Sequence, residues 1–109
     1  MNDKLIYHLT TEKELNEHTK DGLYSPSSLA KEGFIHFSTK DMVTRSAMLY
    51  YPHVDQVLVI EVCSSGLGKN LKFEKIKTGE HFPHLYAPLK VSDIVQTFSI
   101  FKNDDFRFE

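Results

Sequence analysis

The chain has 109 residues, of which 40% are hydrophobic and 26% are charged, which is typical of one globular domain and excludes a largely disordered chain. Its apolar runs, such as residues 57–60, are far shorter than the ~20 residues that a transmembrane helix needs. The formal net charge of -2 arises from 13 Lys and Arg against 15 Asp and Glu, so the sequence disfavours nonspecific binding to nucleic acid.

The N-terminal residues predict a strand followed by a surface helix. Side chains alternate along residues 4–9, which indicates a strand. Its two faces carry Leu5, Tyr7 and Leu9 on one side and Ile6, His8 and Thr10 on the other. Thr11 and Glu14 have the spacing of a capping box, and the helix that they begin is expected to continue to Lys20 and to stop at Gly22.

A second short helix and a short strand are expected next. The helix is predicted over residues 29–32, with Ser27 or Ser28 as its cap and Gly33 at its end. Residues 34–38 alternate again and predict the strand. One side of this strand carries Phe34, His36 and Ser38, and the other carries Ile35 and Phe37.

A third helix is expected after Thr39. Val43, Ala47 and Tyr50 recur at helical spacing, which predicts the face that this helix buries. Pro52 cannot continue a helix, so the helix is expected to end there.

The second half of the chain predicts strands and loops. Residues 56–62 form the most apolar segment and are rich in β-branched side chains, which is typical of a central strand. Residues 71–76 are expected to form a partly exposed strand and residues 95–101 a last strand, after a short turn at residues 91–94. Between these strands, residues 79–86 are predicted to form a loop.

Together these elements predict the α+β class with two or three short helices. We expect one domain over residues 1–103 and a loosely held polar tail over residues 104–109, which contains Phe106 and Phe108. No cationic segment leads into an apolar stretch near the N-terminus, so we expect a cytoplasmic protein. The single cysteine, Cys63, excludes an internal disulfide and any multi-cysteine metal site.

Three groups of polar side chains interrupt otherwise apolar segments. His8 and Thr10 lie two residues apart on one predicted strand, so the imidazole and the hydroxyl face the same way. His36 and Ser38 repeat this arrangement on another strand. Such a pair can hold a sugar hydroxyl or a phosphate oxygen, although it can also satisfy its own neighbours. The third group, in residues 80–86, comprises Glu80, His81, His84 and Tyr86. Because buried polar groups need partners, we expect the three groups to share a pocket.

The third group allows two other interpretations. The three-residue spacing of His81 and His84 suits a pair of metal ligands, but there is no HExxH pattern and Pro83 opposes the helix that this spacing prefers. We therefore predict no metal site. In the plain structural interpretation, Phe82 and Tyr86 pack in an aromatic loop and the histidines cap backbone groups.

Two long runs carry a resemblance to a known family. SLAKEGFIHFS at residues 28–38 and GEHFPHLY at residues 79–86, followed by Pro88 and Leu89, resemble the bacterial family catalogued as domain of unknown function 952. The resemblance covers nearly the whole chain, and the family is filed without an activity. It implies a fold similar to that of ADP-ribosyltransferases, in which a split, strongly bent β-sheet grips a nucleotide in a central cleft.

A weaker resemblance concerns enzymes that bind NAD. The run Tyr7-His8-Leu9-Thr10 is similar to the Tyr-His-Gly-Thr strand with which ADP-ribosyltransferases and RNA 2'-phosphotransferases contact NAD. Residues 34–38 likewise resemble the second His-containing strand of the phosphotransferases. This resemblance implies that Glu80 and His36 are catalytic. The ligand-binding residues that we expect are His8, Thr10, Ser38, Arg45, His81, His84 and Tyr86.

The sequence departs from these enzymes in two ways. Leu9 stands where the glycine of their strand lets a ligand approach the backbone closely. The phosphotransferases rely on several arginines, whereas this chain has only Arg45 and Arg107, and Arg45 is the stand-in. Glu61 is a rival of Glu80 for the catalytic carboxylate, although it lies inside an apolar strand.

We therefore expect a cleft that binds NAD, ADP-ribose or a related nucleotide, with NAD as the substrate of ADP-ribosyl or phosphoryl transfer to an unidentified acceptor. The alternative is a non-catalytic module for nucleotide binding or protein interaction, which the replaced glycine and the scarcity of arginine favour. A two-histidine phosphoesterase is a third hypothesis, because the first two polar groups are both His-x-Thr/Ser units. No membrane partner is expected. A nucleic acid is expected as a partner only through a modified end.

Overall fold

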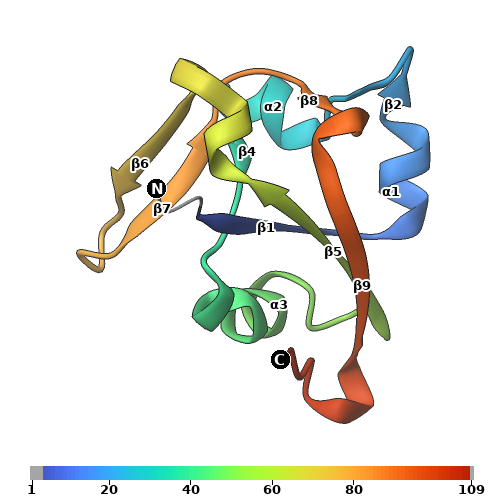
Figure 1. Ribbon diagram of the computed structural model, residues 1–109. Coiled ribbons are helices and arrows are strands. Elements are labelled where there is room, and N and C mark those ends of the chain that lie inside the picture. Colours follow the sequence, from blue (N-terminus) through green and yellow to red (C-terminus); the bar gives the residue numbers. More distant parts are fainter. Residues whose placement is uncertain (1–3, 109) are drawn as a thin grey trace.

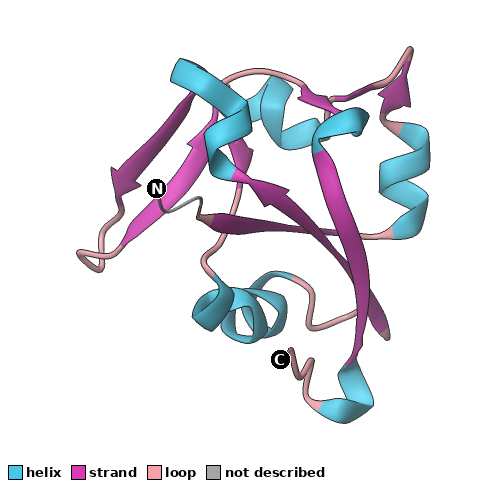
Figure 2. Ribbon diagram, in the orientation of Figure 1, coloured by secondary structure: helices cyan, strands magenta, loops and turns pink. Residues whose placement is uncertain are grey.

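The computed structural model describes residues 4–108 and places them in three small antiparallel sheets and several short helices (Figure 1, Figure 2). The strands are β1 (Leu5–Thr10), β2 (Thr19–Lys20), β3 (Leu23–Tyr24), β4 (Ile35–His36), β5 (Gln56–Cys63), β6 (Leu71–Lys75), β7 (His81–Leu85), β8 (Leu89–Lys90) and β9 (Ile94–Phe101). The helices are α1 (Glu12–Glu17), α2 (Ser27–Glu32) and α3 (Val43–Tyr50), with 3-10 turns at Lys40–Met42, Ser64–Asn70, Val91–Asp93 and Lys102–Asp104. The α+β class predicted from the sequence is confirmed. Within the described residues, no helix is long and apolar enough to cross a membrane.

The first sheet has β5 in its middle, with β1 on one side and β9 on the other. Both pairs are antiparallel, and the β1–β5 register runs from Leu5 opposite Cys63 to Thr10 opposite Leu58. The β-branched side chains of β5 suit this position, because they pack well on a strand that is covered on both faces. The central strand predicted from the sequence is therefore confirmed.

Two backbone hydrogen bonds join β1 to the segment that follows β4. The Tyr7 N–H donates to the Ser38 carbonyl at 2.9 Å, and the Ser38 N–H donates to the Tyr7 carbonyl at 2.6 Å. β4 itself belongs to another sheet, in the order β4-β7-β6. This bridge between Tyr7 and Ser38 therefore ties two sheets together and brings the strand of His8 beside the strand of His36.

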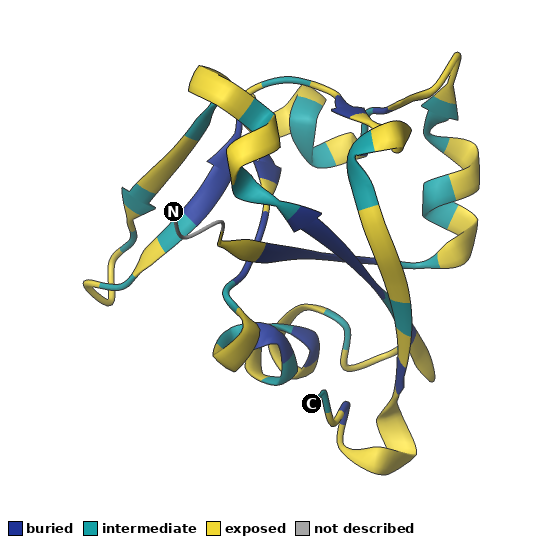
Figure 3. Ribbon diagram, in the orientation of Figure 1, coloured by how far each residue is buried: buried dark blue, intermediate teal, exposed yellow. Residues whose placement is uncertain are grey.

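The first sheet carries a hydrophobic cluster on each face, because its side chains alternate. The first cluster contains Ile6, Ile60 and Val62 from the sheet, together with Tyr24, Ile35, Phe37, Leu85 and Leu89. The second cluster contains Tyr7, Leu9, Val57, Val59 and Ile100 from the sheet, together with Val43, Ala47 and Phe106. Figure 3 shows this buried interior along β1 and β5. The two faces predicted for the first strand are confirmed.

The first helix is shorter than predicted. α1 ends at Glu17, and Gly22, with a φ of 79°, lies in the turn between β2 and β3 instead of stopping a helix. Strand pairing prevails over helix propensity here because it brings Tyr24, at the end of β3, into the first cluster. The cap is confirmed, since the Thr11 hydroxyl accepts a hydrogen bond from the Glu14 N–H at 3.1 Å.

The second helix begins earlier than predicted. Ser27 and Ser28 lie inside α2, and the residue at its N-cap is Pro26, which makes no side-chain hydrogen bond. The predicted serine cap is therefore wrong. Gly33 ends the helix with a φ of 88°, in the left-handed region that glycine adopts readily, as predicted.

The third helix buries Val43 and Ala47 as predicted, but Tyr50 is 66% exposed. The buried face follows a spacing of four residues, so Tyr51 and not Tyr50 packs against the second cluster. This correction matters for function, because it leaves the Tyr50 ring on the surface of α3.

Residues 79–86 were predicted to form a loop, but they contain β7, the middle strand between β4 and β6. A proline is unusual in a middle strand because it has no N–H to donate. Pro83 is accommodated because its carbonyl accepts from the Phe37 N–H at 2.9 Å, just beyond the end of β4 at His36. In an antiparallel pair, the N–H and the carbonyl of one residue point to the same neighbouring strand. The N–H that Pro83 lacks would therefore point toward Phe37, where β4 has already ended.

Residues 104–108 are not the loosely held tail that their polar composition predicted. Phe106 is only 2% exposed and belongs to the second cluster. The ring of Phe108 packs edge-on against Tyr7 and against Phe98, each at 5.2 Å between ring centroids. Thr44 also donates to the Phe106 carbonyl at 2.8 Å. Two aromatic side chains thus fasten this segment to the sheet.

Replacing Phe106 with alanine should lower the free energy of unfolding by about 3–5 kcal/mol, because the change leaves a cavity in the second cluster. Phe101→Ala is the matched control, since Phe101 is 45% exposed, and it should cost less than about 1 kcal/mol. Urea unfolding followed by circular dichroism measures both variants. Equal and small losses would show that the C-terminal segment does not hold the fold.

Candidate functional site

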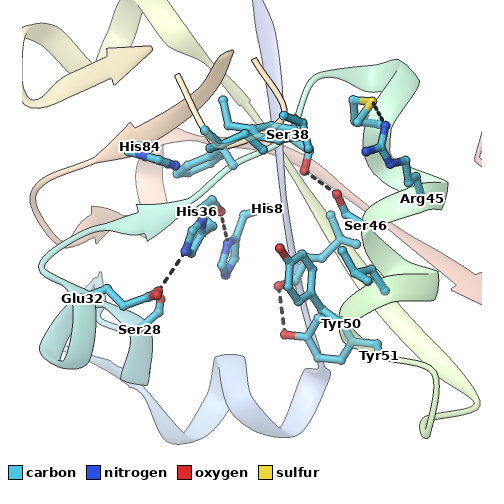
Figure 4. A pocket seen from close by; sticks show the side chains of 17 residues that line it. His8, Ser28, Glu32, His36, Ser38, Arg45, Ser46, Tyr50, Tyr51 and His84 are labelled. Carbon is cyan, nitrogen blue, oxygen red and sulfur yellow. Dashed lines mark hydrogen bonds and ion pairs between the residues drawn. The ribbon is translucent and has the colours of Figure 1, made fainter. Parts of the chain in front are cut away.

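A cleft of about 630 Å³ lies between α3 and the segment formed by α2 and β4. Figure 4 shows the side chains that line it, with imidazoles on one side and two tyrosines of the α3 region on the other. Five residues that the sequence analysis proposed as site residues line the cleft: His8, His36, Ser38, Arg45 and His84. The cleft therefore draws on all three polar groups, although only part of each group reaches it.

Strand register brings two of the imidazoles together. His36 in β4 and His84 in β7 are direct partners in the antiparallel pair, and directly opposed residues project to the same side of a sheet. Their ring centroids lie 5.0 Å apart with an interplanar angle of 83°. The sequence analysis grouped these residues but treated β7 as a loop, so it could not predict this pairing.

The imidazole of His8 makes hydrogen bonds through both ring nitrogens. Nδ1 donates to the His36 carbonyl at 2.7 Å, because a carbonyl oxygen can only accept. Nε2 lies 2.8 Å from the Tyr24 hydroxyl. Burial lowers the pKa of His8 to about 4, so the ring is neutral at pH 7 and Nε2 accepts. His8 therefore forms a fixed part of the cleft wall and keeps no ring nitrogen free for a ligand.

Thr10 lies behind His8 and does not line the cleft. Its buried hydroxyl is 3.2 Å from the Tyr24 hydroxyl and 3.2 Å from Glu14 Oε1. Four contacts link the His36 carbonyl to Glu14, but only three protons are available when His8 is neutral and Glu14 is ionised. Because Tyr24 donates to His8, the Thr10 hydroxyl donates to either Tyr24 or Glu14, and one of these two contacts is left without a proton. Thr10 thus lies behind Tyr24 in this network and does not face the cleft.

His36 is the exposed imidazole of the cleft. Its Nε2 lies 2.8 Å from Glu32 Oε1, and the two side chains are 51% and 50% exposed. Glu32 also lines the cleft, and the sequence analysis missed it. Its only signal in the sequence is the four-residue spacing from His36. The pair provides an imidazole and a carboxylate that can exchange protons with a ligand.

His84 is buried, with 7% of its side chain exposed, and its ring stacks on Phe34 at 4.1 Å between centroids. Nδ1 lies 2.8 Å from Glu74 Oε1, and the same oxygen accepts from the Tyr86 hydroxyl at 2.5 Å. The bond from Tyr86 and then that from His84 lower the pKa of Glu74, and the bond to Glu74 raises the pKa of Tyr86. Tyr86 is therefore turned toward Glu74 and not toward the cleft.

The second ring nitrogen of His84, Nε2, is buried and has no hydrogen-bond partner within residues 4–108. It is the only buried side-chain nitrogen or oxygen of the described residues in this condition. Buried polar atoms are almost always paired in native proteins, so this nitrogen is an unusual feature of the cleft.

Arg45 and Glu80 form an ion pair at the edge of the cleft. Nη1 and Nη2 of Arg45 lie 3.2 Å and 3.3 Å from the two carboxylate oxygens, and Thr78 donates to Glu80 at 2.8 Å. Glu80, proposed as catalytic, does not itself line the cleft, and neither does the exposed His81. The proposed catalytic carboxylate is thus a neighbour of the arginine that reaches the cleft.

α3 supplies an apolar wall that the sequence analysis did not identify. Leu49 and Tyr50 are 64% and 66% exposed, and both line the cleft. The four-residue spacing of the buried face leaves these two side chains outside the core, which is the signal that could have found them. A large exposed aromatic beside a cleft is a common feature of ligand sites.

The backbone of β1 is open to the cleft at Leu9. Tyr7 directs its N–H and carbonyl away from β5, toward Ser38. Leu9 lies two residues further along the strand, so its N–H and carbonyl point to the same edge. The Tyr51 hydroxyl donates to the Leu9 carbonyl at 3.2 Å. The N–H therefore adds a backbone donor to the lining of the cleft.

Glu61, the rival carboxylate, lies away from the cleft. Tyr7 donates to its Oε2 and Gln96 to its Oε1, both at 2.9 Å. It is 6% exposed and faces the second cluster beside Tyr7, its partner in the strand register. Burial and the bond to Glu61 raise the pKa of Tyr7 to about 12. Among the described residues, no group of three or more His, Cys, Asp or Glu side chains is placed to hold a metal ion.

Comparison with known proteins identifies a family and similar structures. The family model described as "Protein of unknown function (DUF952)" matches residues 9–97. The crystal structure of protein CC0527 from Caulobacter crescentus is 30% identical, with 89% of this chain and 86% of that chain covered and a TM-score of 0.79. The solution NMR structure of CC0527 is also 30% identical, with 89% and 84% covered and a TM-score of 0.74. No curated protein matches the chain.

The neutral, buried state of His8 should make the fold sensitive to acid. The folded pKa of about 4 lies below the ordinary value of 6.5, so the unfolded chain binds more protons between these two values. The free energy of unfolding should be undiminished above about pH 6.5 and should fall, by up to about 3 kcal/mol, as the pH approaches 4. Chemical denaturation at a series of pH values measures this slope.

His8→Gln should be less stable than the wild type at pH 7 but should show a flatter dependence of stability on pH in this range. His18→Gln, on α1's C-terminal side, is the control and should keep the wild-type slope. An unchanged slope in the His8 variant would contradict the assignment.

Proposed function

The chain belongs to the DUF952 family of proteins of unknown function, and from that premise we propose that its cleft binds a nucleotide of the NAD or ADP-ribose type. The family description names no ligand, so the proposal rests on the residues of the cleft. The volume of about 630 Å³ lies within the range of roughly 300–1,000 Å³ that is typical of small-molecule sites.

The observation that carries this proposal is the contrast between the two walls. The α3 wall presents Leu49 and Tyr50, which suit the flat apolar face of a base. The rest of the lining presents the imidazole of His36 and the hydroxyl of Ser38, which is also 3.2 Å from the Ser46 hydroxyl of α3. These groups suit ribose hydroxyls and phosphate oxygens. A nucleotide has these two kinds of surface at its two ends.

Arg45 provides the positive charge that a phosphate requires. In the structure, the guanidinium of Arg45 donates to both carboxylate oxygens of Glu80. A phosphate offers oxygens in a similar arrangement. The two side chains are 58% and 36% exposed, so their ion pair contributes little to stability and is easily exchanged. We therefore assign Glu80 the role of a competitor that a bound phosphate replaces.

The leucine at position 9 is compatible with this function. Its side chain belongs to the second cluster and is 9% exposed, so the side chain is not the group that borders the open strand edge. The Leu9 N–H can donate to a carboxamide such as that of nicotinamide. The Leu9 carbonyl can accept from the same group once Tyr51 releases it.

For a transfer reaction, we favour His36 with Glu32 as the acid–base pair over Glu80. Both residues line the cleft and are half-exposed, whereas Glu80 is held by Arg45 and Thr78. ADP-ribosyl or phosphoryl transfer with NAD as the substrate remains our proposed reaction class, and a purely binding role is the alternative. The two-histidine phosphoesterase is not favoured, because both ring nitrogens of His8 are bonded within the protein.

Arg45→Gln should weaken the binding of ADP-ribose by roughly tenfold or more, because it removes charge-assisted hydrogen bonds to the phosphate. Glu80→Gln should have the opposite effect and tighten binding, because it leaves the guanidinium without its carboxylate. Isothermal titration calorimetry with ADP-ribose and NAD measures both changes.

Lys13→Gln, on the exposed side of α1, is the control for the loss of one positive charge and should bind like the wild type. Absence of binding to NAD and ADP-ribose by the wild-type protein would refute the proposed function. Weaker binding in the Glu80 variant would show instead that this carboxylate contacts the ligand.

The proposed ADP-ribosyl transfer breaks the bond between nicotinamide and its ribose, and in the absence of another acceptor water takes the ADP-ribosyl group. Wild-type protein incubated with NAD should therefore release nicotinamide and ADP-ribose, and Glu32→Gln should reduce that rate by about 100-fold or more while NAD binding is retained. Glu17→Gln, on α1, is the matched control. Liquid chromatography of the reaction mixture detects nicotinamide. Binding of NAD without release by the wild type would establish the non-catalytic alternative.

A further inference from the structure

The proton on the His84 ring is placed by its neighbours. Glu74 accepts two hydrogen bonds at Oε1, one from the Tyr86 hydroxyl and one from Nδ1 of His84. These bonds lower the pKa of the carboxyl group, so Glu74 is ionised at neutral pH and can only accept. In the neutral form of the ring the proton of His84 therefore resides on Nδ1, and Nε2 carries a lone pair.

That lone pair has no donor within the described part of the chain. Nε2 is buried without a partner, and one face of the His84 ring is stacked on Phe34. The ring of His36 meets the His84 ring at an interplanar angle of 83°. A buried polar atom that lacks its hydrogen bond destabilises the fold. Since His84 lines the cleft, a donor that enters the cleft can remove this cost.

We propose that Nε2 of His84 accepts a hydrogen bond from a ribose hydroxyl of the bound nucleotide. This inference rests on the proposed function and names the part of the nucleotide that this wall recognises. A neutral imidazole lone pair requires a donor, which a hydroxyl has and an ionised phosphate lacks. The base is assigned to the wall of Leu49 and Tyr50, so the sugar is the donor that faces the histidines.

The imidazole of His36 is a close neighbour of the His84 ring. Its ring lies 5.0 Å from that of His84, between centroids, and half of its side chain is exposed. The partner that holds it, Glu32, is also half-exposed, and such pairs are weak. Because Nε2 is buried, a neighbouring side chain has to move before the sugar reaches it, and the half-exposed, weakly held His36 is able to do so.

The test compares NAD with four NAD analogues, each of which lacks one of its ribose hydroxyls, by isothermal titration calorimetry. The wild type should bind one analogue about tenfold or more weakly than NAD, because the lost donor leaves Nε2 unpaired again. His84→Phe should bind NAD and that analogue with equal affinity. His81→Phe, in the same strand but exposed and outside the cleft, should keep the wild-type discrimination.

The outcomes separate this inference from the proposed function. Binding of NAD and all four analogues with equal affinity by the wild type would overturn the ribose contact and leave nucleotide binding intact. The ribose contact is also overturned if His84→Phe folds and still discriminates. Absence of NAD binding would overturn both.

A second measurement uses the unaltered protein and does not depend on the folding of a variant. Nitrogen-15 NMR of the imidazoles should show His84 at pH 7.5 with the proton on Nδ1 and an unprotonated Nε2. Saturation with NAD should shift the Nε2 resonance in the direction of an accepted hydrogen bond. A proton on Nε2 in the free protein, or an Nε2 resonance that NAD leaves unchanged, would overturn the inference.

Discussion

The pair of backbone hydrogen bonds between Tyr7 and Ser38 is the constraint on which the cleft depends. The bridge involves only one residue from each segment, but it fixes the open edge of β1 against the segment that follows β4. β4 has only two residues of its own, paired to β7, so the bridge adds a backbone link to the first sheet beside the packing of Ile35 and Phe37 in the first cluster. The cleft lies where the chain leaves this bridge and enters α3.

The same bridge explains why so many polar groups can be buried nearby. Once β4 lies beside β1, the His36 carbonyl is available to accept from His8, and the Tyr24 hydroxyl closes the other side of the imidazole. Each of these groups would carry a desolvation cost if it were left alone. Their mutual bonds offset that cost and make the wall rigid, since no ring nitrogen of His8 can turn away without losing a partner.

The sequence predicted local features well wherever neighbouring residues decide them. The alternation of β1, the apolar run of β5, the Thr11 cap and the Gly33 stop are confirmed, because each depends on side chains a few positions apart. Predictions were wrong where a distant contact decides. β7 forms despite Pro83 because the proline falls at the end of its pairing with β4, and Phe106 is buried because it packs with residues of the second cluster that are distant in sequence.

For the site, the same distinction holds. Composition and spacing selected His8, His36, Ser38, Arg45 and His84, which the structure brings to one cleft. The carboxylates that define what these side chains can do were missed or placed elsewhere: Glu32 on α2, Glu74 on β6 and Glu80 beside Arg45. The carboxylate of Glu74 fixes which nitrogen of His84 donates, and that of Glu80 holds the guanidinium of Arg45. No pattern in the sequence reveals these partners, which lie 10 and 35 positions apart.

The three histidines of the cleft differ in how many ring nitrogens the protein itself uses, and this difference separates their roles. His8 uses both, which makes it a structural part of the wall. His36 uses one, from a half-exposed position that allows it to move. His84 also uses one, but its second nitrogen is buried and cannot be satisfied by bulk water. Of the three, His84 is therefore the one with a buried ring nitrogen that the described residues leave without a partner.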